Sequence, residues 1–322
     1  MRVPAAIFLA AAIVSATAAS IQASADDFPS HSIRIIVPYA PGGPSDLGAR
    51  LMAKTLTNHI GQSVYIENKP AAAGLVETEA FVKADPDGYT LLVGAIGPFA
   101  IIPNFRTVHY DVAKDFAPLA LVWKSSQVLL VNPKLGVTTL AGFMAYAKAH
   151  PGKVTVGSAG VGSVTHMALE QFKHETHLDL VHVPYRGTGP MMPNLLGGQI
   201  DAAFAEVTLV SQYVDSGKLV GLAITSPERS AQLPNIPTTA ESGLPGVDTQ
   251  NWFGIVASPK TPSDRLARLQ AAVKATLADP AYQAAVAKQG LTLKDWDADS
   301  YRQLIQSQIV KWKPIVKAAN LK

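Results

Sequence analysis

The sequence predicts an α/β protein of two strand–helix units, in which a C-terminal segment returns to the first unit. Three observations lead to this prediction. Apolar runs rich in β-branched residues alternate with helical patterns over residues 33–93, and the alternation begins again near residue 121. The 24 glycines and 23 prolines of the 322 residues fall in short clusters between these runs, as turn residues do. Three helical stretches close the chain without predicted strands of their own.

The first 25 residues have the pattern of a secretory signal. Arg2 is their only charge, an apolar stretch covers 5–19, and Ala23, Ser24 and Ala25 end the segment with small side chains. The apolar stretch is shorter than the roughly 20 residues that span a bilayer. We therefore expect a signal peptide over 1–25, with cleavage after Ala18 as the alternative, and a soluble mature protein. In a Gram-negative bacterium this protein would be located in the periplasm.

The first unit alternates strands and helices, which predicts parallel strands covered by helices. Apolar residues three and four positions apart predict a helix over 47–60 that stops at Gly61, and Ser45 or Asp46 is its expected N-cap. A second helix is expected to end over 80–83. The strands expected in this unit are 33–39, 64–68 and 89–93.

The second unit repeats this order and precedes an irregular stretch over 227–245. Its expected strands are 128–131, 154–157, 180–183, 200–204 and 219–224. Its expected helices are 140–149, 163–174 and two shorter ones that end near Gly198 and at Gly217. A last strand is expected at 252–256, and the closing helices, expected to pack on the first unit, are 262–278, 281–288 and 300–318.

This order predicts two domains, 26–124 with 250–322 and 125–249, after the signal segment. Ligands of parallel sheets bind at the carboxyl ends of the strands, and in a hinged two-lobe protein those ends face a shared cleft. We therefore expect a binding cleft between the two domains.

Composition and motifs argue against several functions. The chain has no cysteine, which excludes a disulfide framework, a thiolate zinc site and a thiol nucleophile. Its net charge of +3 is not clustered and its aromatics do not alternate with basic residues, so no nucleic-acid partner is expected. His174 and His177 are spaced i,i+3 without a third ligand, and no G-x-S-x-G motif is present. We expect no metal, no cofactor and no enzymatic activity.

Three strand-to-helix loops carry the candidate binding residues. Loop 40–46 contains paired glycines and a helix start, and loop 157–166 offers hydroxyl groups before another helix start. Helix-start amides favour an anion, although each loop also fits an ordinary turn with a polar helix cap. The equivalent positions of the two loops favour the anion interpretation of each. In loop 184–190, Tyr185 is a candidate for stacking on a ligand, whereas Arg186 is expected to be solvated.

A series of motifs runs in order through the whole mature chain. Among them are 33–43 with Asp46, 67–70, 85–92, 158–166, 183–187, 195–199, 233–238, 241–246 and 252–254. Together they resemble Bug-type extracytoplasmic solute receptors, the substrate-binding subunits of tripartite tricarboxylate transporters. The resemblance implies a type II periplasmic-binding-protein fold, with two α/β domains joined by a hinge and a central ligand cleft. It also implies a monomer that encloses a small organic carboxylate and delivers it to membrane permease subunits.

In such receptors the loops equivalent to 41–46 and 158–165 grip one carboxylate, and the loops after Val93 and over 184–188 shape the rest of the pocket. The resemblance and the loop analysis together give these candidate ligand-binding residues: Tyr39, Pro41, Gly42, Gly43, Ser45, Asp46, Gly94, Ile96, Phe99, Ser158, Gly162, Ser163, Thr165, His166, Tyr185, Gly187, Thr188, Ala205 and Glu206. Asp46 is expected to support ligand binding through the loop and helix cap rather than through its charge. Asp46→Asn should then leave binding nearly unchanged.

One departure from the family pattern and one apolar loop bear on the ligand. Members often carry aspartate after the strand at 200–204, where this chain has Ala205 and Glu206, and this argues against a ligand with an ammonium group. The apolar side chains of Ile96 and Phe99 favour an aromatic acid, and a dicarboxylate is the other candidate. A ligand-sensing module for a membrane signalling protein remains the alternative function, ahead of an exported enzyme.

Overall fold

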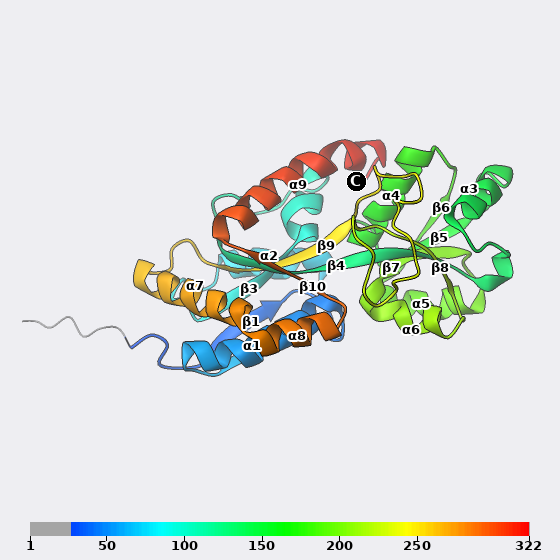
Figure 1. Cartoon of the computed structure of the whole chain (residues 1–322). Helices are drawn as coiled ribbons and strands as arrows, with labels where there is room; N and C mark the ends of the chain where they lie inside the picture. Colours follow the sequence, from blue (N-terminus) through cyan, green and yellow to red (C-terminus); the bar gives the residue numbers. More distant parts are fainter. Residues whose placement is uncertain (1–26, 322) are drawn as a thin grey trace, which may run out of the picture.

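The computed structural model describes residues 27–321, without the side chains of 294–296, and forms two α/β lobes side by side (Figure 1). The predicted signal segment 1–25 lies outside the described residues. Within 27–321, no helix combines the length and apolar character that crossing a membrane requires.

The first lobe begins with three parallel strands, β1 (Ile33–Val37), β2 (Val64–Asn68) and β3 (Thr90–Ala95), as predicted. Helices α1 (Pro44–Ile60) and α2 (Leu75–Val82) connect them. Trp123 fixes the position of α1, because its Nε1 donates to the Pro44 carbonyl at 3.1 Å and its ring fills the space beside Gly48. A Cβ on Gly48 would lie 2.2 Å from that ring, so only glycine fits there.

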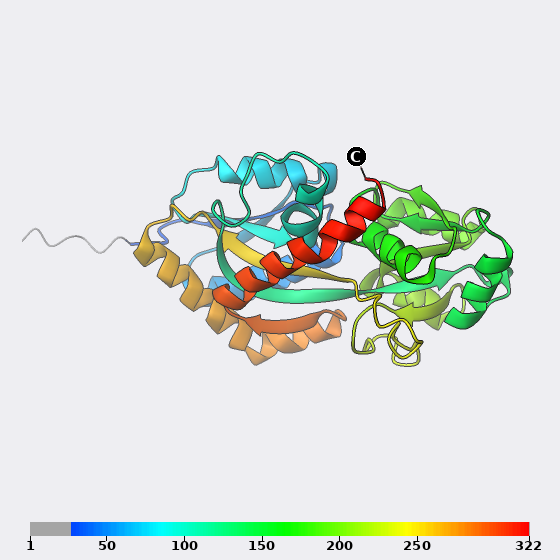
Figure 2. The same cartoon turned by 90° about the horizontal axis from the view of Figure 1, so that it is seen from above.

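Two long strands, β4 (Ala117–Val131) and β9 (Gln250–Ala257), run antiparallel through the centre of the molecule. They make the sheet mixed rather than wholly parallel, with the strand order β2-β1-β3-β9-β4-β7-β5-β6. The predicted strand at 128–131 is only the end of β4, which crosses both lobes (Figure 2). Polar residues at 124–127 break the apolar pattern, and for this reason the sequence did not reveal the full strand.

The second lobe confirms the predicted alternation of strands and helices. Its strands are β5 (Thr155–Ser158), β6 (Val181–Pro184), β7 (Ala202–Glu206) and β8 (Val220–Ile224). Its helices are α3 (Leu140–Ala149), α4 (Val164–Thr176), α5 (Thr188–Gly197) and α6 (Val207–Asp215). Strands β5, β6 and β7 are parallel, so their carboxyl ends point the same way.

The C-terminal segment returns to the first lobe as predicted, through α7 (Ser263–Ala278), α8 (Pro280–Lys288) and α9 (Ala298–Ala318). The expectation that it has no strand was wrong. Strand β10 (Thr292–Trp296) pairs antiparallel with β4. The edge of β4 that it occupies exists only once the sheet has formed. Helix α9 packs on β4 and also against α4 of the second lobe, so it bridges the lobes (Figure 2).

Candidate functional site

A cleft of about 1020 Å³ lies where the two lobes meet. Its walls come from the loops that follow β1, β3, β5 and β6 and from the end of β7, which are carboxyl ends of strands as expected for a sheet of this kind. The sequence-predicted residues that line it are Tyr39, Pro41, Gly42, Gly43, Ser45, Ile96, Gly162, Ser163, Tyr185, Gly187, Thr188 and Glu206. Contact of these residues with a ligand stays a prediction.

The other predicted residues lie behind the lining. They are Asp46, Gly94, Phe99, Ser158, Thr165, His166 and Ala205, all outside the set of lining residues. Phe99 belongs to the apolar core, and its ring fills the space where Gly94 would carry a Cβ. The polar members of the group hold the two cleft loops from the back.

The first cleft loop is held by the Asp46 carboxylate. It accepts hydrogen bonds from the N–H of Gly42 at 2.9 Å, from Asn68 Nδ2 at 2.9 Å and from Arg50 Nε at 3.0 Å. Burial pushes the pKa of Asp46 upward, but these donors outweigh it and hold the pKa below its usual value. The predicted N-cap at Ser45 or Asp46 was wrong. Helix α1 begins at Pro44 with Gly43 as N-cap, because proline is pre-organised for the first helical position.

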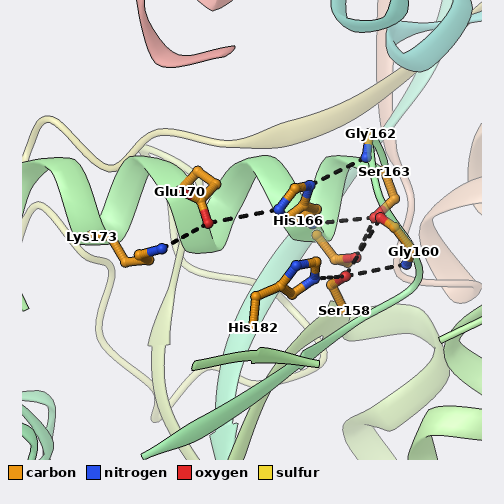
Figure 3. Close-up of polar contacts among 9 residues, drawn as sticks. Ser158, Gly160, Gly162, Ser163, His166, Glu170, Lys173 and His182 are labelled. Carbon is orange, nitrogen blue, oxygen red and sulfur yellow. Dashed lines mark hydrogen bonds and ion pairs between the residues drawn. The ribbon is translucent and has the colours of Figure 1, made fainter. Parts of the chain in front are cut away.

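The second cleft loop, 159–163, is held by hydroxyl groups that the sequence analysis placed against the ligand (Figure 3). Thr165 Oγ1 accepts from the N–H of Ala159 at 2.8 Å, and Ser158 Oγ accepts from the N–H of Gly160 at 3.2 Å. Ser163 caps α4, because its Oγ accepts from the N–H of His166 at 3.2 Å. Ser163 therefore acts as a polar helix cap, which was the alternative to an anion site for this loop.

Both loops leave amide groups open at a helix start. The first N–H groups of a helix have no acceptor inside the helix. Within the described residues, the N–H groups of Ser45 and Asp46 in α1, and of Val164 and Thr165 in α4, have no hydrogen-bond acceptor. Pro44, Ser45, Ser163 and Val164 line the cleft, so two helix starts, one from each lobe, border the same space.

Glu206 lies on the floor of the cleft with 7% of its surface exposed. Its Oε2 accepts from Thr188 Oγ1 at 3.2 Å, and burial raises the pKa of Glu206 above its usual value. The Asn251 side chain also lies near Glu206 and lines the cleft. Burial thus opposes the ionised form of Glu206.

A polar cluster that the sequence did not reveal lies beside Glu206. Gln127 stands opposite Glu206 in the β4–β7 ladder, and Ser125 stands opposite Asn251 in the β4–β9 ladder. Residues two apart in a strand share a face, so these four side chains lie on one side of the sheet. Within 27–321, Ser125 Oγ, both amide atoms of Gln127 and Asn251 Oδ1 are buried without a partner. The cluster was missed because 124–127 did not read as a strand.

The rest of the lining is apolar, with two arginines. Neither Arg106, which follows the short helix Ile102–Asn104, nor Arg186 has an ion pair within the described residues. Arg186 is exposed, as its predicted solvation requires, but it borders the cleft. The apolar lining residues that the sequence analysis did not select include Ile102, Phe105, Val161, Met192, Leu209 and Phe253.

No group of three or more His, Asp or Glu side chains within the described residues is arranged to hold a metal ion. His174 lies in α4 but His177 is already past its end, at φ 55°, so the two do not share a helix face.

Comparison with known proteins identifies relatives over nearly the whole chain. The family model for the tripartite tricarboxylate transporter family receptor matches residues 48–321. Protein BugT of Bordetella pertussis is 34% identical over 318 residues, which cover 98% of this chain and 96% of that protein.

Solved structures show the same fold. An R. palustris protein with adipate superposes with a TM-score of 0.84 at 30% identity, covering 91% of this chain and 98% of that chain. MatC from Rhodopseudomonas palustris with bound malate gives a TM-score of 0.81 at 31% identity, covering 90% and 100%. The periplasmic binding protein BugD gives a TM-score of 0.82 at 29% identity, covering 92% and 99%. These matches confirm the predicted periplasmic-binding fold.

Proposed function

This chain belongs to the tripartite tricarboxylate transporter receptor family, and we propose that it captures a small organic carboxylate between its lobes and delivers it to membrane permease subunits. The members of this family are periplasmic solute receptors and not enzymes, as the sequence analysis predicted. The relatives solved with adipate and with malate support a carboxylate as the ligand of this chain.

One observation carries the proposal: two helix starts with open N–H groups border one cleft from opposite lobes. Each start combines unpaired donors with the positive end of a helix dipole, which together favour an anion. A carboxylate placed between Ser45 and Val164 would receive donors from both lobes and would therefore favour their approach.

The lining suggests which carboxylates fit. Arg106 and Arg186 add positive charge, and the surrounding apolar side chains suit an aliphatic or aromatic body. Glu206 is buried, and burial opposes the negative charge with which an ammonium group would pair. Aromatic acids and dicarboxylates are therefore the classes we propose, ahead of amino acids.

We propose that the lobes close about a hinge in the two central strands. Strand β4 pairs with β9 up to Ser126, and with β7 and β8 from Gln127 and Val128 onward. This change supports the predicted division into domains 26–124 with 250–322 and 125–249. Action as a monomer and export through a signal peptide over 1–25 complete the proposal.

A thermal-shift screen of residues 26–322 tests the ligand class with mono-, di- and tricarboxylates, aromatic acids, amino acids and neutral amides. A ligand at 100 times its Kd adds about 2.7 kcal/mol and raises Tm by several degrees. A shift confined to carboxylates is expected. A shift with neutral amides alone would refute an anion receptor.

A pair of variants tests the role of the open amides. Val164 is the first residue of α4, a position that tolerates proline, so Val164→Pro removes one N–H and keeps the helix. Val164→Ala removes the side chain but keeps the N–H. We expect Val164→Pro to bind adipate about tenfold more weakly than Val164→Ala, the loss of one charge-assisted hydrogen bond. Equal affinities would contradict the amide site.

A further inference from the structure

Two stacked imidazole rings, neither of which lines the cleft, hold the loop 159–163 in place. The rings of His166, on α4, and His182, on β6, lie 4.0 Å apart between centroids and 11° from parallel (Figure 3). His166 is 2% exposed, and neither ring lines the cleft. Their influence on a ligand must therefore pass through the loop.

A series of two hydrogen bonds connects the loop to the His182 ring. The N–H of Gly160 donates to Ser158 Oγ at 3.2 Å, and Ser158 Oγ lies 2.7 Å from His182 Nε2. His182 Nε2 is the nearest acceptor for the hydroxyl proton of Ser158, so this ring nitrogen accepts the hydrogen bond. Burial and the neighbouring His166 lower the pKa of His182 to about 4, which keeps this ring neutral.

The His166 ring terminates the second chain. The N–H of Gly162 donates to His166 Nδ1 at 3.2 Å, so this nitrogen carries no proton. His166 Nε2 faces Glu170 Oε1 at 3.7 Å, and that oxygen accepts from Lys173 Nζ at 3.1 Å. The bonding pattern thus assigns a neutral ring with its proton on Nε2.

Further titratable groups lie on α4 and on the elements packed against it. Burial pushes the pKa of Glu170 upward, but the neighbouring His166 and the hydrogen bond and charge of Lys173 hold it below its usual value. On the elements packed against α4, Glu206 of β7 accepts from Thr188, and Lys311 of α9 pairs with Asp248.

We propose that His166 is a positioning residue that makes ligand capture depend on pH. The neutral ring accepts the Gly162 amide and holds the loop in its cleft-lining conformation. When the ring gains a proton, Nδ1 becomes a donor, the bond to Gly162 is lost and the loop leaves that conformation. The stacked His182 does not take up a second proton, so His166 alone is the switch. The inference rests on the proposed function, because it places the ligand against this loop.

The ligand-free protein gives the first test, by NMR titration of the His166 ring and the Gly162 amide from pH 5 to pH 8. We expect the amide resonance to shift together with ring protonation. His166→Asn places Oδ1 where Nδ1 lies, so it keeps an acceptor that does not titrate, and its Gly162 amide should stay constant. A Gly162 amide that ignores the His166 titration would overturn the proposal, whether or not any ligand is known.

Calorimetry with adipate and malate from pH 6 to pH 8 gives the second test. In the wild type, affinity should fall by up to tenfold per pH unit as His166 gains its proton, as expected for one linked proton. His166→Asn should remove this loss, and His166→Gln, which lacks an acceptor at that position, should bind weakly at every pH. His174→Asn, on the exposed face of the same helix, controls for protonation of the ligand.

The two tests separate the two proposals. An unchanged pH profile in His166→Asn would refute the positioning role. Absence of carboxylate binding at any pH by folded wild-type protein would count against the proposed function instead, and the NMR titration would still decide the role of His166.

Discussion

The ring of Phe105, in the first lobe, lies against Gly162, in the second, so closely that a Cβ on Gly162 would be 2.8 Å from its Cζ atom. Both residues line the cleft, and Gly162 also has a left-handed φ of +78°. The lobes therefore touch at the loop that His166 holds from behind. Glycine is required here for two independent reasons, backbone conformation and space.

Gly162→Ala should therefore lower the free energy of unfolding by more than backbone strain alone. A left-handed conformation costs a non-glycine residue roughly 1–2 kcal/mol. Gly136→Ala is the matched control, because Gly136 has a φ of +71° and no atom within 4 Å of the added Cβ. Urea denaturation should show a larger loss for Gly162→Ala, and Phe105→Leu in the same chain should recover the excess. Equal losses in the two alanine variants would show that Phe105 gives way freely.

Asp46→Asn should lower the free energy of unfolding by about 1–3 kcal/mol, because the amide cannot accept all of the bonds from Gly42, Asn68 and Arg50. The sequence-based expectation that Asp46→Asn is nearly harmless concerns ligand binding and stays a prediction. Since the folded-state pKa is lowered, the carboxylate stabilises the fold above about pH 4, and that contribution is lost as the pH falls further.

Denaturation at pH 3 and pH 7 checks this prediction. Asp264→Asn is the control, since Asp264 also lies in the first turn of a helix but is exposed. A deficit of the same size at both pH values would argue that shape, not charge, is what Asp46 provides.

Glu206→Gln should be more stable than the wild type by an amount that grows with pH. The raised pKa of Glu206 means that the folded protein keeps its proton more tightly than the unfolded chain does. The wild type therefore loses stability as the pH rises above about 4, by at most about 1.4 kcal/mol per pH unit, until the folded-state pKa is passed. Glutamine keeps the acceptor for Thr188 and does not titrate. Denaturation between pH 4 and pH 8 should show the divergence, and a constant difference would mean that Glu206 is not shifted.

Arg106→Ala and Arg186→Ala should each slow association with adipate by about 3–10-fold at low ionic strength, with a smaller effect at high salt. Charges at the rim of a site act mainly on the rate of encounter and are screened by salt. Arg229→Ala is the control, because Arg229 pairs with Glu241 and does not line the cleft. Stopped-flow kinetics measures the rates. A loss that is independent of salt would indicate direct contact in place of steering.

Much of the fold was predictable because its patterns are local. The strand at Val64–Asn68 and the helix at Leu140–Ala149 were predicted to the residue, since apolar periodicity and a terminal turn mark both. The glycine-containing loops after β1 and β5 were identified for the same reason. Strand β10 was missed because its partner, β4, is about 170 residues away in the chain and gives no local signal.

The sequence by itself determined the alternation of strands and helices, the family and the two helix starts at the cleft, because each depends on residues close together in the chain. Only the tertiary structure decided which side chains line the cleft and which hold the loops. Ser158, Thr165 and His166 lie close to Gly162 and Ser163 in the sequence. Their side chains nevertheless accept hydrogen bonds from backbone N–H groups of the loop and do not line the cleft. Gln127 and Asn251 meet Glu206 only through strand pairing. The direction in which a polar side chain points depends on its partners in the folded protein, and a local sequence pattern does not identify these partners.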